Sequence, residues 1–115
     1  MENSSTKDAT EDNYWEIAPL TDLPPGERLF VEVDGRQIVL FNIAGQVFAI
    51  GDVCTHDNGP LGDGEVEANE VICPRHGARF NISTGKAQGL PAVVDIPTYL
   101  VRVVNGMIAI GIPKG

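Results

Sequence analysis

Residues 28–41 read RLFVEVDGRQIVLF, and this stretch decides the fold class. Two runs rich in branched and aromatic residues are joined by Asp34-Gly35, and both residues of such a turn take positive φ angles. The stretch therefore predicts a β-hairpin. The same pattern returns at Asn105-Gly106, and a turn at Ala44-Gly45 leads into another β-rich run at residues 46–50.

The composition of the whole chain agrees with a β protein. Its 115 residues include 22 Val and Ile against 7 Leu, together with 13 Gly and 8 Pro. Branched side chains suit pleated strands, and abundant turn formers imply many short segments. No stretch keeps a helical period of 3.6 residues. We therefore expect one all-β domain over residues 14–115, preceded by a flexible acidic tail at residues 1–13.

The charge of the chain limits the partners that it can have. With 8 Lys and Arg against 16 Asp and Glu, the net charge is −8, which argues against nucleic acid and favours a basic protein face. No apolar run approaches the roughly 18 residues that a membrane span needs. Residues 1–5 lack the features of a signal peptide, so we expect a cytoplasmic protein with no membrane contact.

All cysteines and histidines of the chain fall in two short boxes. The first box is Cys54-Thr55-His56 and the second is Cys73-Pro74-Arg75-His76, with residues 57–72 between them. Two thiolates and two imidazoles are the donor set of a tetrahedral metal site or an iron–sulfur cluster. Two loops rich in glycine and polar residues carry these boxes, and function is usually found on loops that a rigid framework positions.

Four other interpretations of the boxes compete with a cluster. A buried thiol or a lone histidine can be an ordinary structural residue, but that account would have to hold for all four residues at once. A Cys–His pair can be a nucleophile, but the second box is then unexplained. A Cys54–Cys73 disulfide is disfavoured in the cytoplasm. Zinc accepts two cysteines and two histidines, yet zinc fingers set their cysteines together and their histidines on a helix. A mixed box suits a dinuclear cluster better, because both loops then hold both metals.

The two boxes resemble the motif of Rieske [2Fe–2S] proteins, and more narrowly the small Rieske ferredoxins of bacterial multicomponent oxygenases. The resemblance includes Gly59-Pro60-Leu61 after the first box and residues 77–87 and 89–92 after the second. It extends over roughly residues 15–112. It implies an antiparallel β framework with a smaller cluster-binding lobe at about residues 51–85.

The resemblance also implies ligands and partners. Cys54 and Cys73 would hold one iron of a single [2Fe–2S] cluster, His56 and His76 would hold the other, and residues 89–91 would cover the cluster. The protein would be a monomeric one-electron carrier with no catalysis of its own. It would pass electrons from a flavin-containing ferredoxin reductase to a terminal oxygenase. Two alternatives stay open: a subunit of another redox system, such as nitrite reductase or iron–sulfur assembly, and a zinc-stapled interaction module without redox chemistry.

The same comparison of motifs predicts a reduction potential at the low end of the Rieske range, near −150 mV. Respiratory-chain Rieske proteins have an additional cysteine in each box, whereas the matching positions here are Pro60 (or Gly59) and Arg75, so no disulfide can form. Those proteins also have hydroxyl residues where this chain has Ala78 and Phe80. Hydroxyl donors to sulfur stabilise the reduced state, and their absence lowers the potential.

Residues around the boxes receive structural interpretations. We expect Leu61 and Phe80 to pack beneath the loops. Four glycines should permit tight turns, and five acidic residues between the boxes form either a solvated face or a docking patch for a basic partner. The glycines are Gly59, Gly62, Gly64 and Gly77, and the acidic residues are Asp57, Asp63, Glu65, Glu67 and Glu70.

Overall fold

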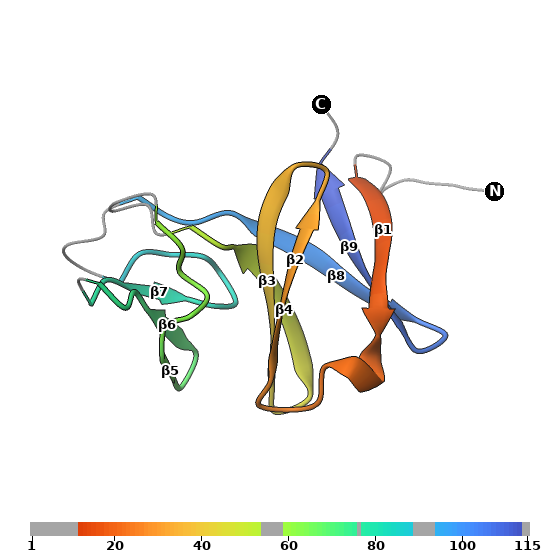
Figure 1. Ribbon diagram of the computed structural model, residues 1–115, viewed down its shortest axis with the longest axis horizontal. Coiled ribbons are helices and arrows are strands. Elements are labelled where there is room, and N and C mark those ends of the chain that lie inside the picture. Colours follow the sequence, from red (N-terminus) through yellow and green to blue (C-terminus); the bar gives the residue numbers. More distant parts are fainter. Residues whose placement is uncertain (1–11, 54–58, 76, 89–93, 114–115) are drawn as a thin grey trace.

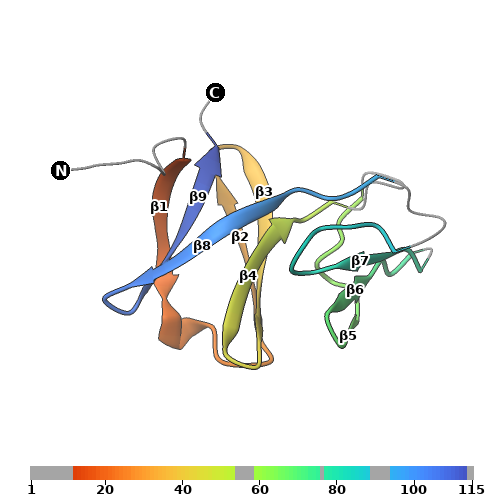
Figure 2. The same cartoon turned by 180° about the vertical axis from the view of Figure 1, so that it is seen from behind.

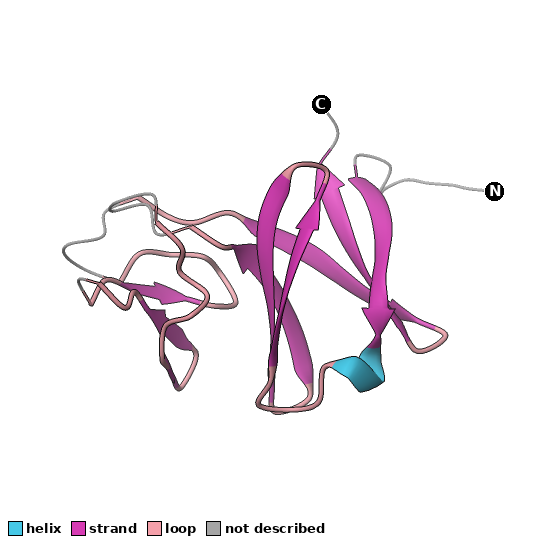
Figure 3. Cartoon of the chain, viewed as in Figure 1, coloured by secondary structure: helices cyan, strands magenta, loops and turns pink. Residues whose placement is uncertain are grey.

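The computed structural model describes residues 12–53, 59–75, 77–88 and 94–113. Within these ranges the chain forms strands and one 3-10 helical turn, so the expected all-β class is confirmed (Figure 3). In chain order the elements are β1 (Asp12–Pro19), η1 (Leu20–Asp22), β2 (Arg28–Val33), β3 (Arg36–Ile43), β4 (Gln46–Gly51), β5 (Val66–Glu67), β6 (Glu70–Ile72), β7 (Arg79–Asn81), β8 (Thr98–Val104) and β9 (Met107–Pro113). No helix in the described part of the chain is long and apolar enough to cross a membrane.

The larger sheet has six antiparallel strands in the order β1-β9-β8-β4-β3-β2 (Figure 1). Strand β1 begins at Asp12, where that residue pairs with Pro113 of β9. Residues 12 and 13 therefore belong to the ordered framework, two residues earlier than the boundary expected from the sequence. The rest of the expected tail, residues 1–11, lies outside the described residues.

The three turns expected from the sequence are present and have the expected backbone geometry. Asp34 and Gly35 have φ angles of 53° and 75°, and they connect β2 to β3 with Val33 opposite Arg36. Residues 44–45 and 105–106 likewise have positive φ angles and close the β3–β4 and β8–β9 hairpins. Two positive φ angles match the twist of a two-residue hairpin, which explains why short sequence signals were sufficient here.

A second, smaller sheet lies beside the framework. It has three antiparallel strands in the order β5-β6-β7. Figures 1 and 2, which view the molecule from opposite sides, both place it at one end, next to the end of β4 and the start of β8. It occupies residues 66–81, inside the range expected for a cluster-binding lobe, although the sequence did not predict these strands.

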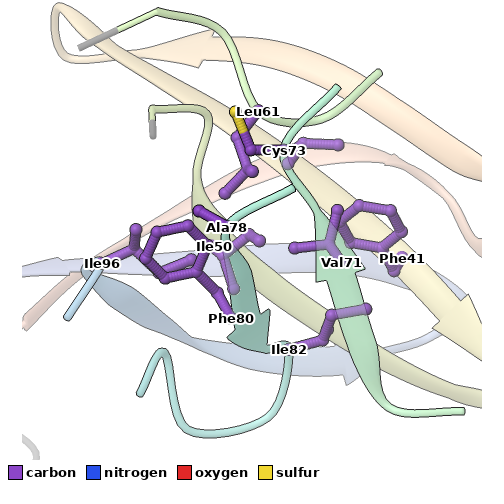
Figure 4. Close-up of a cluster of buried hydrophobic side chains, with 10 residues drawn as sticks. Phe41, Ile50, Leu61, Val71, Cys73, Ala78, Phe80, Ile82 and Ile96 are labelled. Carbon is purple, nitrogen blue, oxygen red and sulfur yellow. The ribbon is translucent and has the colours of Figure 1, made fainter. Parts of the chain in front are cut away.

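Both faces of strand β3 are buried, because the strand lies between two hydrophobic cores. Ile38 and Leu40 belong to the framework core, which also includes Ile108 and Ile110 of β9. The alternate residues of β3, Val39 and Phe41, face the other way and join a second core. That second core contains Val39, Phe41, Ile50, Leu61, Val71, Cys73, Ala78, Phe80, Ile82 and Ile96 (Figure 4). The smaller lobe is thus packed onto β3, an interior strand of the framework.

Candidate metal centre

Cys73, Pro74 and Arg75 of the second box lie in the connection between β6 and β7. Ile72 pairs with Arg79 at the end of the two strands. Beyond that pair, the Cys73 amide donates to the Ala78 carbonyl at 2.7 Å, and the Gly77 amide donates to the Cys73 carbonyl at 3.0 Å. Gly77 has a φ angle of 76°, a conformation that residues with a Cβ rarely adopt. The backbone around Cys73 is therefore closed by hydrogen bonds, and Gly77 is needed for the turn itself.

Cys73 is buried, with 1% of its surface exposed. Figure 4 shows it beside Leu61 at one end of the second core, with Ala78 and Phe80 further along. Leu61 and Phe80 are both fully buried, which confirms that they pack inside the protein and are not surface contacts for a partner. Iron–sulfur clusters are bound by cysteine thiolates. A cysteine that a hairpin holds in place and that is withdrawn from water is suited to this role.

The segment that follows the first box is held by two charged side chains of the framework. Asp52 accepts hydrogen bonds at Oδ1 from the amides of Leu61 and Gly62, at 2.9 and 2.6 Å. Arg28 Nη1 donates to the carbonyls of Gly62 and Gly64, the latter at 2.7 Å. One carboxylate thus satisfies amides and one guanidinium satisfies carbonyls of the same turn, residues 61–64.

Gly64 is required in this turn for lack of space and not for its φ angle. A Cβ placed on Gly64 would lie 1.8 Å from the carbonyl oxygen of Ile72, the residue before Cys73. The Gly64 amide donates to the Leu61 carbonyl at 3.0 Å. The segment after the first box, at Gly64, therefore contacts the segment before the second box, at Ile72, through backbone atoms. Only glycine allows this close approach.

A second contact, exposed to solvent, joins the segment after the first box to Arg75 of the second box. Arg75 Nη1 donates to the Pro60 carbonyl at 2.8 Å. A Cβ on Gly59 would lie 2.6 Å from Nη2 of the same guanidinium. The sequence analysis predicted that these positions, which have no cysteines, cannot form a disulfide. In the structure a hydrogen bond connects Pro60 and Arg75.

Three of the four candidate ligands, Cys54, His56 and His76, lie outside the described residues, as do Asp57 and the expected covering loop at residues 89–91. No group of three or more Cys, His, Asp or Glu side chains gathers among the residues that are described. The structure brings the flanks of the two boxes together through Gly59, Pro60 and Arg75. The described part of the donor set, the buried Cys73 thiol, fits a cluster ligand.

The acidic residues between the boxes are partly neutralised. Arg79 Nη1 lies 3.0 Å from Glu67 Oε1 and 3.2 Å from Glu70 Oε1. The hydrogen bond to Glu67, and after it the one to Glu70, raises the pKa of the Arg79 guanidinium above its ordinary value. Asp63 and Glu65 are exposed. Part of the expected acidic face is therefore engaged within the small sheet.

Arg28, Asp52 and Arg75 are the residues that the sequence analysis did not assign. Arg28 begins a strand and lies 34 residues before Gly62, so no local pattern connects the two. Asp52 stands two positions before the first box, and a carboxylate next to a glycine-rich turn is a weak signal for an amide acceptor. Arg75 is inside the second box, where it was considered only as a position without cysteine.

Comparison with known proteins identifies the family. The Rieske [2Fe-2S] domain matches residues 13–100, which is most of the chain. This chain belongs to the Rieske [2Fe-2S] domain family. A ferredoxin component of the naphthalene 1,2-dioxygenase/salicylate 5-hydroxylase systems of Ralstonia sp. is 39% identical over 93 residues, which are 81% of this chain and 89% of the relative.

Solved structures agree with this family. The ferredoxin of carbazole 1,9a-dioxygenase from Nocardioides aromaticivorans IC177 superposes with a TM-score of 0.81 at 32% identity, covering 88% of this chain and 98% of the other. A chain in a complex of reduced oxygenase and oxidised ferredoxin in carbazole 1,9a-dioxygenase gives the same TM-score at 26% identity, covering 89% and 95%.

Family membership decides the nature of the cofactor. The group bound by this Rieske domain is a [2Fe–2S] cluster, as the donor set and the mixed boxes predicted. The alternative of a zinc-stapled module without redox chemistry is therefore wrong. The protein is an electron carrier, and the chemistry available to it is the transfer of one electron at a time.

Proposed function

We propose that this Rieske protein is the ferredoxin component of a multicomponent ring-hydroxylating oxygenase, and that it carries electrons from a flavin-containing reductase to the terminal oxygenase. The observation that carries the proposal is the match to a relative named as a ferredoxin component, which includes 89% of that relative's length. The resemblance is thus to a whole ferredoxin. A similar fold occurs in a complex between an oxygenase and its ferredoxin.

The proposed cluster ligands are Cys54 and Cys73 on one iron and His56 and His76 on the other. The position of Cys73 supports the assignment, because its thiol is buried at the closed end of a hairpin. The contact from Arg75 to Pro60 supports it as well, since it brings the flanks of the two boxes together. When bound, the cluster accepts and returns a single electron, and neutral imidazoles in place of two thiolates make that electron easier to accept.

The framework residues keep the ligand loops in place while the charge of the site changes. Asp52 and Arg28 hold the backbone of residues 61–64. The β6–β7 hairpin holds Cys73. Sites whose loops are held by such supporting hydrogen bonds need little rearrangement during the reaction, which suits a protein that is reduced and oxidised repeatedly.

The surface charge supports a carrier that binds its partners briefly. A net charge of −8 favours fast encounter with basic faces of a reductase and an oxygenase. Brief complexes suit a small carrier that must leave one partner before it reaches the next. We propose that it works as a monomer in the cytoplasm and that its potential lies near −150 mV.

The first experiment is a visible spectrum of the purified protein before and after dithionite, with iron, zinc and acid-labile sulfide measured on the same sample. We expect a red-brown protein that bleaches on reduction and contains two irons and two sulfides per chain. Single Cys54→Ser and Cys73→Ser variants should lose the cluster, while a Ser83→Ala variant, altered on the surface of the small lobe, should keep it. A cluster that survives both cysteine substitutions would contradict the ligand assignment.

A second experiment tests the role in an oxygenase system. The protein replaces the ferredoxin in a reconstituted naphthalene 1,2-dioxygenase assay with its reductase, its oxygenase, NADH and naphthalene. We expect product formation that depends on the added protein and that falls as salt is raised, because salt screens the attraction between partners. A protein that the reductase reduces but that supports no product with this or any other ring-hydroxylating oxygenase would contradict the proposal and favour another redox system.

A further inference from the structure

One charged side chain of the second box, Arg75, contacts the segment that follows the first box. Arg75 Nη1 donates to the Pro60 carbonyl at 2.8 Å, although the two residues are 15 positions apart. The guanidinium also occupies the space next to the Gly59 backbone, where a Cβ would lie 2.6 Å from Nη2 and 2.7 Å from Cζ. A side chain at position 59 would therefore require the guanidinium to move away from its present place beside Pro60.

We propose that Arg75 is a positioning residue that locks the first ligand loop to the second and so slows the loss of the cluster. The inference rests on the proposed ligands, because Arg75 lies two residues after Cys73 and directly before His76. Pro60 precedes Leu61, whose amide is held by Asp52 of the framework. The first loop is thus attached at Leu61 to the framework and at Pro60 to the second loop.

The chemistry of the arginine side chain suits this role. A guanidinium is planar, always charged, and donates several hydrogen bonds from a fixed fork, whereas a lysine ammonium is a compact point charge. A charged donor to a carbonyl makes a stronger hydrogen bond than a neutral one. The bond is exposed to solvent, so its contribution is modest, and we expect its removal to accelerate opening of the loops by about threefold to tenfold.

The test compares five variants: Arg75→Ala, Arg75→Lys, Gly59→Ala, the double variant Gly59→Ala/Arg75→Ala, and a control, Arg102→Ala. Arg102 is also exposed, but it lies over the Tyr14 ring on the framework, 3.8 Å from its centroid, away from the boxes. For each cluster-loaded protein the rate of loss of visible absorbance in excess chelator is measured. The reduction potential is measured on the same samples.

We expect Arg75→Ala to lose its cluster about threefold to tenfold faster than the unaltered protein. Gly59→Ala, which displaces the guanidinium without removing it, should also accelerate the loss, and the double variant should be no faster than Arg75→Ala alone. Arg75→Lys keeps the positive charge, so it should retain the potential while still losing the cluster faster. Arg102→Ala should behave as the unaltered protein does.

Two results would overturn the inference. The first is an unchanged rate of cluster loss in Arg75→Ala, even if its potential shifts, because Arg75 would then act through charge alone. The second is an additive effect in the double variant, because Gly59 and Arg75 would then act independently. Failure of the proposed ligand assignment gives a different result: the cluster would survive the Cys54→Ser and Cys73→Ser substitutions.

Discussion

Replacing Arg28 by Met should loosen the segment after the first box without unfolding the framework. The guanidinium donates two hydrogen bonds, to the carbonyls of Gly62 and Gly64, and its carbon Cζ lies 5.1 Å from the centre of the Phe41 ring. Methionine keeps much of the aliphatic volume and the contact with Phe41. It cannot donate to either carbonyl, so residues 62–64 lose their attachment to β2.

The size of the effect follows from these contacts. A hydrogen bond from a charged donor contributes about 1.5–3 kcal/mol when buried. Arg28 is partly exposed, so we expect about 1–1.5 kcal/mol for each of its two bonds, or about 2–3 kcal/mol together. The lost cation–π interaction, about 0.5 kcal/mol, lies between two paired framework residues and does not enter the free energy of loop opening. A free energy of 2–3 kcal/mol corresponds to about a 30- to 150-fold rise in the population of the opened loop.

Hydrogen–deuterium exchange measured by mass spectrometry can observe this opening directly. The amides of Leu61, Gly62 and Gly64 are all hydrogen-bonded within the turn or to Asp52. A peptide from residues 59–66 should exchange about 30- to 150-fold faster in Arg28→Met. A peptide from β3, which is paired on both sides, should exchange at the unaltered rate.

The chain offers a closely matched control in Arg36. Both arginines begin a strand, and both lie over an aromatic ring, since Arg36 is 5.9 Å from the centre of the Tyr99 ring. Arg36→Met should therefore show the small cation–π effect alone, with unchanged exchange at residues 59–66. If Arg28→Met leaves that peptide unchanged, or if both arginine variants accelerate it equally, the guanidinium does not anchor the loop and the reasoning is refuted.

Three other variants test separate parts of the site. Gly64→Ala brings a Cβ within 1.8 Å of the Ile72 carbonyl oxygen, so the two backbones must separate, at a cost in stability of about 3 kcal/mol or more. The iron and sulfide measured per purified chain should fall sharply. Full loading would contradict the close approach. The double variant Ala78→Ser/Phe80→Tyr should raise the reduction potential, measured by redox titration, by about 50 mV for each hydrogen bond gained to sulfur. An unchanged potential in a cluster-loaded protein would show that missing hydroxyl donors do not lower the potential. His76→Cys adds a negative ligand, so the Rieske spectrum should be lost or the potential should drop, whereas an unaltered spectrum and potential would remove His76 from the ligand set.

The sequence was sufficient for the fold class and for the chemistry of the site because both depend on local patterns. Asp34-Gly35 and Asn105-Gly106 specify their turns through the φ angles that these residues tolerate, and the structure confirms both. The donor atoms of the two boxes indicated a metal site, and the mixed order of Cys and His together with the resemblance to the Rieske motif favoured a cluster over zinc. The family match confirms that cofactor. Neither inference needs to know where distant parts of the chain meet.

Only the tertiary structure decided how the loops are held. The attachment of Gly62 and Gly64 to Arg28 spans more than 30 residues, and the lock from Arg75 to Pro60 joins two separate loops. From the sequence alone, Arg28 and Arg75 cannot be distinguished from arginines whose side chains only contact water, because their hydrogen bonds depend on which carbonyls the fold brings within reach. The amino acids therefore determined what the site can bind, and the packing of the small lobe on β3 determined which side chains keep the site closed.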